Sequence, residues 1–351
     1  MEELADCARV ALERDGRAIL LYGPGGGYGP LREWLAARHG VEPSRVVLTN
    51  GSLQGFVFLA EHLVRPGSRV LVEAPTYDRP LKILARLGAE IVPLPMDDDG
   101  LLPDALERAV GERDVPAFLY TIATFQNPSG RTLSEERRRR VVEIARERGL
   151  LVLEDDPYGR VRYEGEAPPL LFDLDGGENV GYASSFSKTI APGLRVGWFV
   201  LPAPLAAQVE GLAVSTYISP PFLTQATVHE FLERGNFEPN VARVNGLLGA
   251  RRDAMLDALE RHLPDGATWT RPEGGYFVWV DMAGGPETAT VLPRAEQAGV
   301  PFVKGSDFFA SNGGEHSLRL AFSYVSPEQI GEGMARLAPL LVGSSVPAPA
   351  V

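Results

Sequence analysis

Residues 185–197 read SFSKTIAPGLRVG, and this stretch places one lysine, Lys188, between two serines and an arginine. A lysine becomes a nucleophile and a base when burial or neighbouring positive charge lowers its pKa. The hydroxyls of Ser185 and Ser187 and the guanidinium of Arg195 are donors that a phosphate group would require. The segment therefore predicts a reactive lysine beside a bound phosphate.

The same residues also fit the Ser-x-x-Lys pattern of enzymes that form an acyl-serine, with Ser185 as nucleophile. That chemistry requires S-D-N and K-T-G elements further along the chain. Neither is present, and Ser306-Asp307 is followed by Phe308. The acyl-serine interpretation is the weaker one.

A second candidate anion site lies in residues 46–55, VVLTNGSLQG, where an apolar run leads through a glycine turn into a helical pattern. Free backbone N–H groups and the helix dipole favour an anion at such a place. Gly51, Ser52 and Gln54 are the candidate contacts. Taken alone, an ordinary helix cap would be the simpler interpretation.

Two further clusters carry chemistry that suits pyridoxal phosphate (PLP). In residues 151–158, LVLEDDPY, Asp155 could hold the protonated pyridine nitrogen, which keeps the ring an electron sink, and Tyr158 could reach the ring oxygen. In residues 124–130, TFQNPSG, the amide of Asn127 could contact the same oxygen. Each segment could equally be a simple turn.

The order of apolar runs predicts the fold. Strand-like runs, each expected to be buried on both faces, alternate with helical segments, at 46–49, 69–72, 90–93, 117–122, 150–154 and 180–183. This alternation predicts an α/β domain with a largely parallel sheet. All four polar clusters directly follow a strand, so we expect them to meet at the carboxyl edge of the sheet.

One of the helices is well signalled, with Ser134 as N-cap and Gly149 as C-cap. Its basic run, residues 137–140, is expected on a solvated face, paired with neighbouring glutamates. After about residue 241 a long helical stretch (244–263) leads to strand-like segments at 268–270 and 276–281, which predicts a second α+β domain. The expected division is residues 1–15 as a shortened N-terminal arm of the small domain, 16–240 as the large domain, 241–343 as the C-terminal small domain and 344–351 as a flexible tail.

Composition excludes several classes of protein. A net charge of -12 and a pI near 5.0 argue against nucleic-acid binding, which needs a basic face. No apolar stretch approaches the ~20 residues of a membrane helix, and the acidic N-terminus is unlike a signal peptide, so a cytoplasmic location is expected. With Cys7 as the single cysteine, no intrachain disulfide is possible.

Patterns for other ligands fail. The glycine-rich stretch 23–30 fits neither a dinucleotide-binding register nor a P-loop. Residues 229–233 have glutamate where a zinc helix needs its second histidine, and the five histidines do not cluster, so no metal is expected.

On these motifs the chain resembles the fold type I PLP enzymes, most closely the class I/II aminotransferases of the 2-aminoadipate and multi-substrate kind. The resemblance spans about Leu20 to Leu341, and the S-x-S-K-x4-G-x-R segment is its most specific part. It implies a central, mostly parallel sheet flanked by helices, a smaller α+β domain, and several dozen residues before the Tyr-Gly-Pro motif, where this chain has 21.

The resemblance also implies roles for individual residues. Lys188 would form the Schiff base and move the proton, Asp155 would pair with the pyridine nitrogen, and Tyr158 would contact the ring oxygen. The remaining implied contacts are Asn127 at the ring oxygen and substrate, Tyr77 on the ring face, Gly51, Ser52, Gln54, Ser185, Ser187 and Arg195 at the phosphate, Tyr22 at the phosphate of a partner subunit, and Arg319 at the substrate carboxylate.

The expected activity is therefore transfer of an amino group between an L-α-amino acid and a 2-oxo acid, by a homodimer with shared active sites. The same machinery supports a PLP-dependent lyase, through β-elimination or decarboxylation. A PLP-binding sensor without catalysis is a further alternative, as in regulators that join a DNA-binding domain to an aminotransferase-like body. The acidic chain begins near that body, which favours an enzyme.

Overall fold

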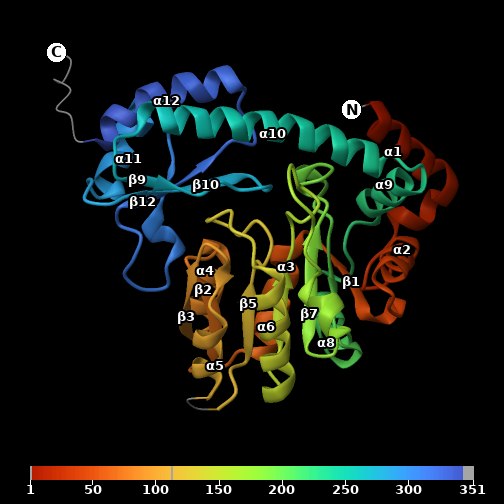
Figure 1. Cartoon of the computed structure of the whole chain (residues 1–351). Helices are drawn as coiled ribbons and strands as arrows, with labels where there is room; N and C mark the ends of the chain where they lie inside the picture. The colour runs from red at the N-terminus through yellow and green to blue at the C-terminus, as the bar shows by residue number, and fades with distance from the viewer. Residues whose placement is uncertain (1, 112–113, 343–351) are drawn as a thin grey trace.

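The computed structural model describes residues 2–111 and 114–342, so the predicted tail lies outside the described residues. Two β-sheets organise the chain (Figure 1). The larger has eight strands in the order β1-β8-β7-β6-β5-β2-β3-β4. Its strands are β1 Val46–Thr49, β2 Arg69–Ala74, β3 Glu90–Asp97, β4 Gly100–Leu101, β5 Phe118–Thr121, β6 Val152–Asp155, β7 Val180–Ser185 and β8 Gly197–Val200.

The prediction of a mostly parallel α/β sheet is confirmed. Strands β7, β6, β5, β2 and β3 pair in parallel, while β8 runs antiparallel to both β7 and β1. The sequence analysis did not identify β8. The expectation that each strand is buried on both faces is wrong for β3, where only Leu94 is fully buried, because its outer neighbour β4 has just two residues.

Helices cover both faces of this sheet. Because successive side chains of a strand point to opposite faces, Leu71 belongs to one hydrophobic core and Val70 and Val72 to the other. The helices are α2 Gly29–His39, α3 Ser52–Leu63, α4 Asp78–Arg86, α5 Pro103–Gly111, α6 Glu135–Arg148, α7 Leu171–Asp175, α8 Ala203–Tyr217 and α9 Phe222–Glu233.

The prediction for the basic run of α6 is partly wrong. Arg137, Arg139 and Arg140 pair at the surface with acidic side chains at 2.5, 2.6 and 2.8 Å. Arg138 instead has no exposed surface. It faces the sheet together with Val141 and Ala145, at the helical spacing of a buried stripe. The helix begins after Ser134 and ends at Gly149, whose φ of 62° is left-handed, as predicted from the caps.

A smaller sheet of four antiparallel strands packs with the C-terminal helices around a separate core. Figure 1 shows α10 crossing the molecule above both sheets, from α1 and α9 to α12. This helix begins earlier than predicted, at Phe237. The elements are α10 Phe237–His262, β9 Ala267–Trp269, β10 Phe277–Met282, α11 Thr288–Gln297, β11 Val303–Lys304, β12 Ser317–Ala321 and α12 Pro327–Leu341.

The N-terminal helix α1, Glu2–Asp15, packs against α9. Its buried residues Cys7 and Ala11 belong to a core of the large sheet. This packing differs from the predicted assignment of residues 1–15 to the small domain, because the apolar stripe of α1 meets a large-domain helix. The boundaries 16–240 and 241–343 stay a prediction.

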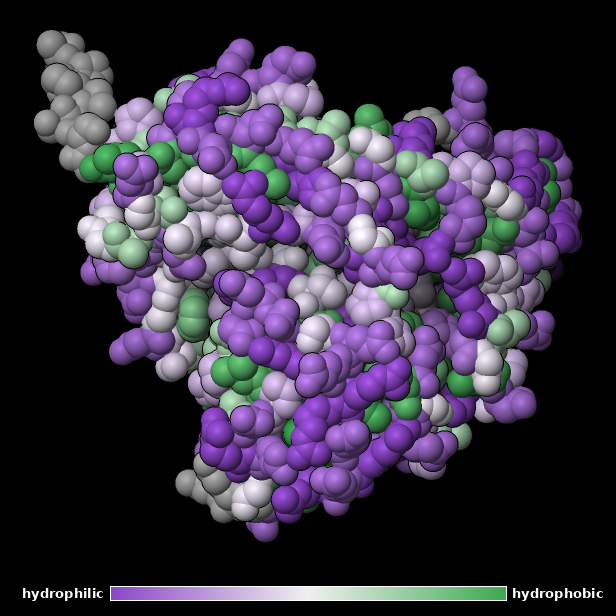
Figure 2. Space-filling view, viewed as in Figure 1, coloured by the Kyte–Doolittle hydropathy of each residue, from purple (hydrophilic) through white to green (hydrophobic). Residues whose placement is uncertain are grey.

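The face of the molecule in Figure 2 is mainly hydrophilic, with apolar residues in small scattered patches. Among the described helices, none combines the length and the apolar character needed to cross a membrane.

Candidate active site

A cavity of about 320 Å³ opens at the carboxyl ends of β5, β6 and β7, between the large sheet and the strands β10 and β12 of the small one. The four polar clusters predicted from the sequence meet here, as expected for the carboxyl edge of a parallel sheet. The predicted residues that line it are Gly51, Ser52, Tyr77, Asn127, Asp155, Tyr158, Ser185, Ser187, Lys188, Arg195 and Arg319.

Two predicted residues do not line the cavity. The side-chain oxygen of Gln54 accepts a hydrogen bond from the backbone N–H of Asn50 at 3.0 Å, so this amide shapes the turn before α3. The prediction that Gln54 contacts a phosphate is therefore not supported by its position. Tyr22 is 80% exposed on the outer surface, and its predicted contact with a partner subunit stays a prediction.

Lys188 lies among polar and aromatic side chains of the cavity. Its Nζ is 5.2 Å from the ring centre of Tyr276 and 5.7 Å from that of Tyr158. Burial lowers the pKa of Lys188, and the positive charges of Arg319 and Arg195 lower it further, while Asp155 opposes them. A lowered pKa leaves more of the amine in its neutral, nucleophilic form.

One group of donors forms a cradle for an anion. The hydroxyl of Ser185 donates to that of Ser187 at 2.7 Å, and Arg195 Nη1 donates to Ser187 Oγ at 3.4 Å. Arg195 Nη2 also donates to the carbonyl of Asn50 at 3.1 Å, which joins this loop to the N-terminus of α3. Gly51 has a φ of 86°, and a Cβ there would lie 2.1 Å from Arg195 Nη2, so only glycine fits.

Asp155 ends strand β6. Its Oδ2 accepts a hydrogen bond from the hydroxyl of Tyr120 at 2.8 Å, whereas its buried Oδ1 has no partner. Burial raises the pKa of Asp155 to about 7, and neighbouring Asp156 adds to this, while Tyr120 and Lys188 lower it. A cationic N–H donor placed at Oδ1 would satisfy this oxygen and favour the ionised carboxylate.

Arg319 enters the cavity from β12. Its guanidinium lies 4.0 Å from the ring centre of Phe277 and 4.9 Å from that of Phe308, and Nη1 donates to Asn127 Oδ1 at 2.7 Å. Its Nε is buried without a partner. The two rings pack against the guanidinium, and a guanidinium can bind a carboxylate through two parallel hydrogen bonds.

Two of the lining residues that the sequence analysis did not name contact the predicted groups directly. Tyr120 lines the cavity from β5 and holds Asp155, and Phe277 lines it beneath Arg319. Tyr120 shares its face of β5 with Ile122, which also lines the cavity, so alternation along the strand was a usable signal. Phe277 had no such signal, since it resembles any buried strand residue.

The residues present fit PLP. The hydroxyls, backbone N–H groups and guanidinium of the cradle suit a phosphate, the unpartnered Oδ1 of Asp155 suits a protonated ring nitrogen, and Lys188 lies in the same cavity. Together with a mostly parallel sheet and a smaller second sheet, this site defines a PLP-dependent enzyme of fold type I.

Comparison with known proteins is consistent with this class. The family model "aminotransferase class I and II" matches residues 2–337, and the chain belongs to this family. It is similar to the 2-aminoadipate transaminase of Thermus thermophilus, with 38% identity covering 97% of this chain and 86% of that protein. It is also similar to aromatic-amino-acid aminotransferase 1 of Thermococcus litoralis, with 36% identity covering 96% of this chain and 84% of that protein.

Among solved structures, the chain is similar to the alpha-aminoadipate aminotransferase of Thermus thermophilus in complex with N-(5'-phosphopyridoxyl)-L-leucine. The TM-score is 0.93 at 37% identity, covering 97% of this chain and 88% of that one. The activity is PLP-dependent transfer of an amino group between an amino acid and a 2-oxo acid, and the lyase and sensor alternatives are not favoured. Within the described part of the chain, no group of three or more His, Cys, Asp or Glu residues could hold a metal ion.

Proposed function

We propose that this aminotransferase binds PLP in the cavity around Lys188 and there exchanges an amino group between an L-α-amino acid and a 2-oxo acid. The observation that carries the proposal is one cavity that joins a lysine of lowered pKa, an anion cradle, the unpartnered Oδ1 of Asp155 and the stacked Arg319. The cofactor, when bound, supplies an electron sink that stabilises negative charge at the substrate's α-carbon.

Each of the following residues of the cavity has a proposed role that follows from its position. Lys188 Nζ would be the general base that takes the proton from the α-carbon of the substrate and delivers it to the carbon of the cofactor. Asp155 Oδ1 accepts from the ring N–H, and the hydroxyl of Tyr158 contacts the ring oxygen. Gly51, Ser52, Ser185, Ser187 and Arg195 bind the phosphate, and Tyr77 covers the ring.

The substrate carboxylate binds to Arg319, next to Asn127. Lys188, Arg195 and Arg319 are the cations among the described residues that line the cavity, and the first two serve the cofactor. A steady-state assay with 2-oxoglutarate and a panel that includes L-phenylalanine and L-2-aminoadipate tests the proposal. Turnover with at least one donor is the expected result, and no turnover with any α-amino acid would contradict it.

Replacing Arg319 by lysine tests the carboxylate contact. We expect kcat/KM for every donor to fall by about 10²-fold, because a lysine ammonium cannot make two parallel hydrogen bonds to a carboxylate. Binding of PLP, followed by absorbance, should stay close to wild type. If kcat/KM changed by less than about threefold, Arg319 would not be the carboxylate site.

We also propose that the protein is a homodimer. Five large apolar side chains are exposed around the loop that begins at residue 20: Leu20, Leu21, Tyr22, Val214 and Ile218. Residues 20–25 and residues 214–219 lie side by side. Gly23 N donates to Ser219 Oγ at 3.3 Å, and a Cβ at Gly25 would lie 2.2 Å from Val214 Cγ2. An exposed apolar patch of this kind is typical of a protein–protein interface.

In this proposal Tyr22 reaches the phosphate of the partner subunit, so the active site is complete only in the dimer. The double variant Leu21→Glu/Val214→Glu should raise the dimer dissociation constant by at least about 10²-fold, because each interface would bury unpaired carboxylates. Turnover should fall in parallel. Sedimentation at micromolar concentration measures the assembly.

The exposed Leu247 on α10 provides a matched control, and Leu247→Glu should remain dimeric. A wild-type protein that sediments as a monomer yet turns over would contradict the shared site.

The proposed location is the cytoplasm, and the proposed domains are residues 16–240 and 241–343.

A further inference from the structure

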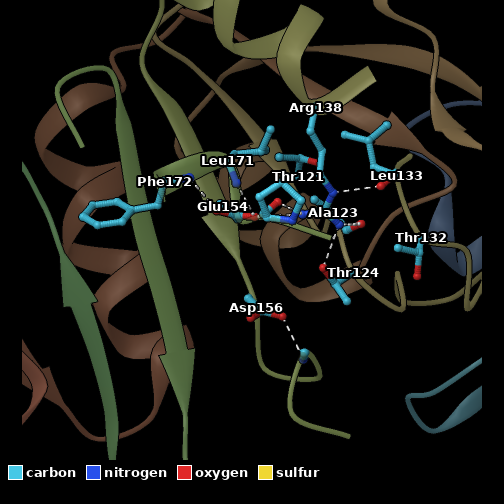
Figure 3. Close-up of polar contacts among 12 residues, drawn as sticks. Thr121, Ala123, Thr124, Thr132, Leu133, Arg138, Glu154, Asp156, Leu171 and Phe172 are labelled. Atoms are coloured by element: carbon cyan, nitrogen blue, oxygen red, sulfur yellow. Dashed lines mark hydrogen bonds and ion pairs between the residues drawn. The ribbon is translucent and has the colours of Figure 1, made fainter. Parts of the chain in front are cut away.

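Arg138 is the largest of the fully buried side chains. A guanidinium is stable in a protein interior only when its charge and its donors are satisfied. Figure 3 shows the side chain of Arg138 reaching toward Leu133, Ala123 and Thr124. Its partners are Leu133 O at 2.8 Å, Ala123 O at 2.7 Å, Thr124 Oγ1 at 2.8 Å, Pro169 O at 3.2 Å and Glu154 Oε1 at 3.4 Å.

The first set of contacts closes the loop that carries Asn127. Arg138 binds the carbonyls of both Ala123 and Leu133, and Leu133 N itself donates to Ala123 O at 2.8 Å. The loop between these two residues presents Asn127 to Arg319 in the active-site cavity. Arg138 therefore fixes the two ends of this loop from the side away from the cavity.

The second set of contacts holds the end of β6. Glu154 is fully buried, and it accepts hydrogen bonds from Leu171 N at 3.1 Å and Phe172 N at 2.9 Å as well as from Arg138 (Figure 3). Adjacent residues of a strand point to opposite faces, so Glu154 faces Arg138 while Asp155 faces the cavity. A shift of Glu154 would move Asp155 with it.

Arg138 also influences the ionisation of buried carboxylates next to the cavity. Its charge acts on three buried carboxylates, those of Glu73, Glu154 and Asp156, of which Glu154 pairs with it directly. Burial raises the pKa of each, to about 7 for Glu154, and the positive charge of Arg138 lowers all three. Asp156 in turn raises the pKa of Asp155. A change in the charge of Asp156 therefore alters the ionisation of Asp155 in the cavity.

We propose that Arg138 is a positioning residue, whose single guanidinium holds the loop of Asn127 and the strand end of Asp155 in the relative placement that the PLP ring requires. The inference rests on the roles proposed above for Asn127 and Asp155. Its distinctive consequence is that one buried side chain outside the cavity controls the binding and the ionisation of the cofactor.

The test uses two mild variants in the full-length protein with PLP. Arg138→Lys keeps the charge but cannot reach all the acceptors, and Thr124→Val removes one acceptor without changing shape. We expect the dissociation constant for PLP to rise about 10- to 100-fold in Arg138→Lys and about 2- to 10-fold in Thr124→Val. Both should shift the midpoint pH of the absorbance band that depends on Lys188.

Val141→Ala is the matched control, because Val141 is fully buried on the same face of the same helix, but its apolar side chain forms no hydrogen bond to the loop or to Glu154. It should lower the melting temperature through a cavity yet leave the dissociation constant and the midpoint pH unchanged. If Arg138→Lys and Thr124→Val also lowered only the melting temperature, Arg138 would be merely structural and the inference overturned. A wild type without a lysine-dependent band would overturn the proposed function itself.

Discussion

Replacing Lys188 by alanine should reduce transamination by about 10⁴-fold, since the variant loses both the nucleophile and the general base. The structure contributes two reasons. Lys188 lies in the cavity with the anion cradle, and burial with two nearby guanidinium groups lowers its pKa. Steady-state assays with the best donor and 2-oxoglutarate measure the loss.

The only other lysines in the sequence, Lys82 and Lys304, can serve as controls for the loss of a lysine outside the cavity. Both form ion pairs near the surface, with Asp78 at 2.8 Å and with Asp307 at 2.5 Å. Lys82→Ala and Lys304→Ala should keep turnover within about twofold, as expected for surface ion pairs. Equal losses in all three variants would mean that Lys188 has no special role.

The variant Asp155→Asn should lower kcat by about 10²- to 10³-fold, the range typical of losing one charged group that stabilises developing charge. Asparagine keeps the shape and the contact with Tyr120, but it cannot stabilise a protonated ring nitrogen. The loss should appear in kcat more than in KM, because this contact acts on the reacting system and not on the substrate carboxylate.

The pH dependence of stability gives an independent check without the cofactor. Burial raises the pKa of Asp155 from its ordinary value of 3.8 to about 7. Between these values the unfolded chain releases this proton while the folded chain keeps it, so this residue's contribution to stability falls as the pH rises from about 4 to 7. The cofactor-free Asp155→Asn variant should therefore melt a few degrees above wild type at pH 8 and close to it at pH 4.

A melting temperature that differed equally from wild type at both pH values would show that Asp155 titrates normally. That result would remove the electrostatic argument for its pairing with the ring nitrogen. It would leave the role of Lys188 untouched.

The sequence was sufficient for the parallel part of the large sheet and for the polar residues that meet in the cavity, for a physical reason. Each parallel strand is a short buried run followed by a loop, and polar clusters that follow such runs must meet at one edge. Ser52, Asn127, Asp155 and Lys188 were placed together on this basis. Strand β8 was not identified, because only a short 3-10 helix at Pro192–Leu194 separates it from the lysine segment, in place of the full helix that precedes most of the other strands.

The misses share another cause, which is that burial of a polar side chain depends on contacts far along the chain. Arg138 stands in a run of four arginines, and the solvated face predicted for that run holds for its neighbours. Its buried partners come from residues 123, 124, 133, 154 and 169, a combination that no local pattern reveals. Gln54 contacts a near neighbour instead, since its side-chain oxygen accepts from the backbone N–H of Asn50, and its contact with a phosphate stays a prediction.

The central claim is that Lys188 carries the cofactor for amino-group transfer, and one spectroscopic titration tests it most directly. The purified protein with PLP is scanned before and after adding L-amino acids and then a 2-oxo acid, beside Lys188→Ala. We predict a band that requires Lys188, that converts to the pyridoxamine form with a donor, and that returns with the oxo acid. A band of equal strength in Lys188→Ala, or one that never converts with any donor, would contradict the account.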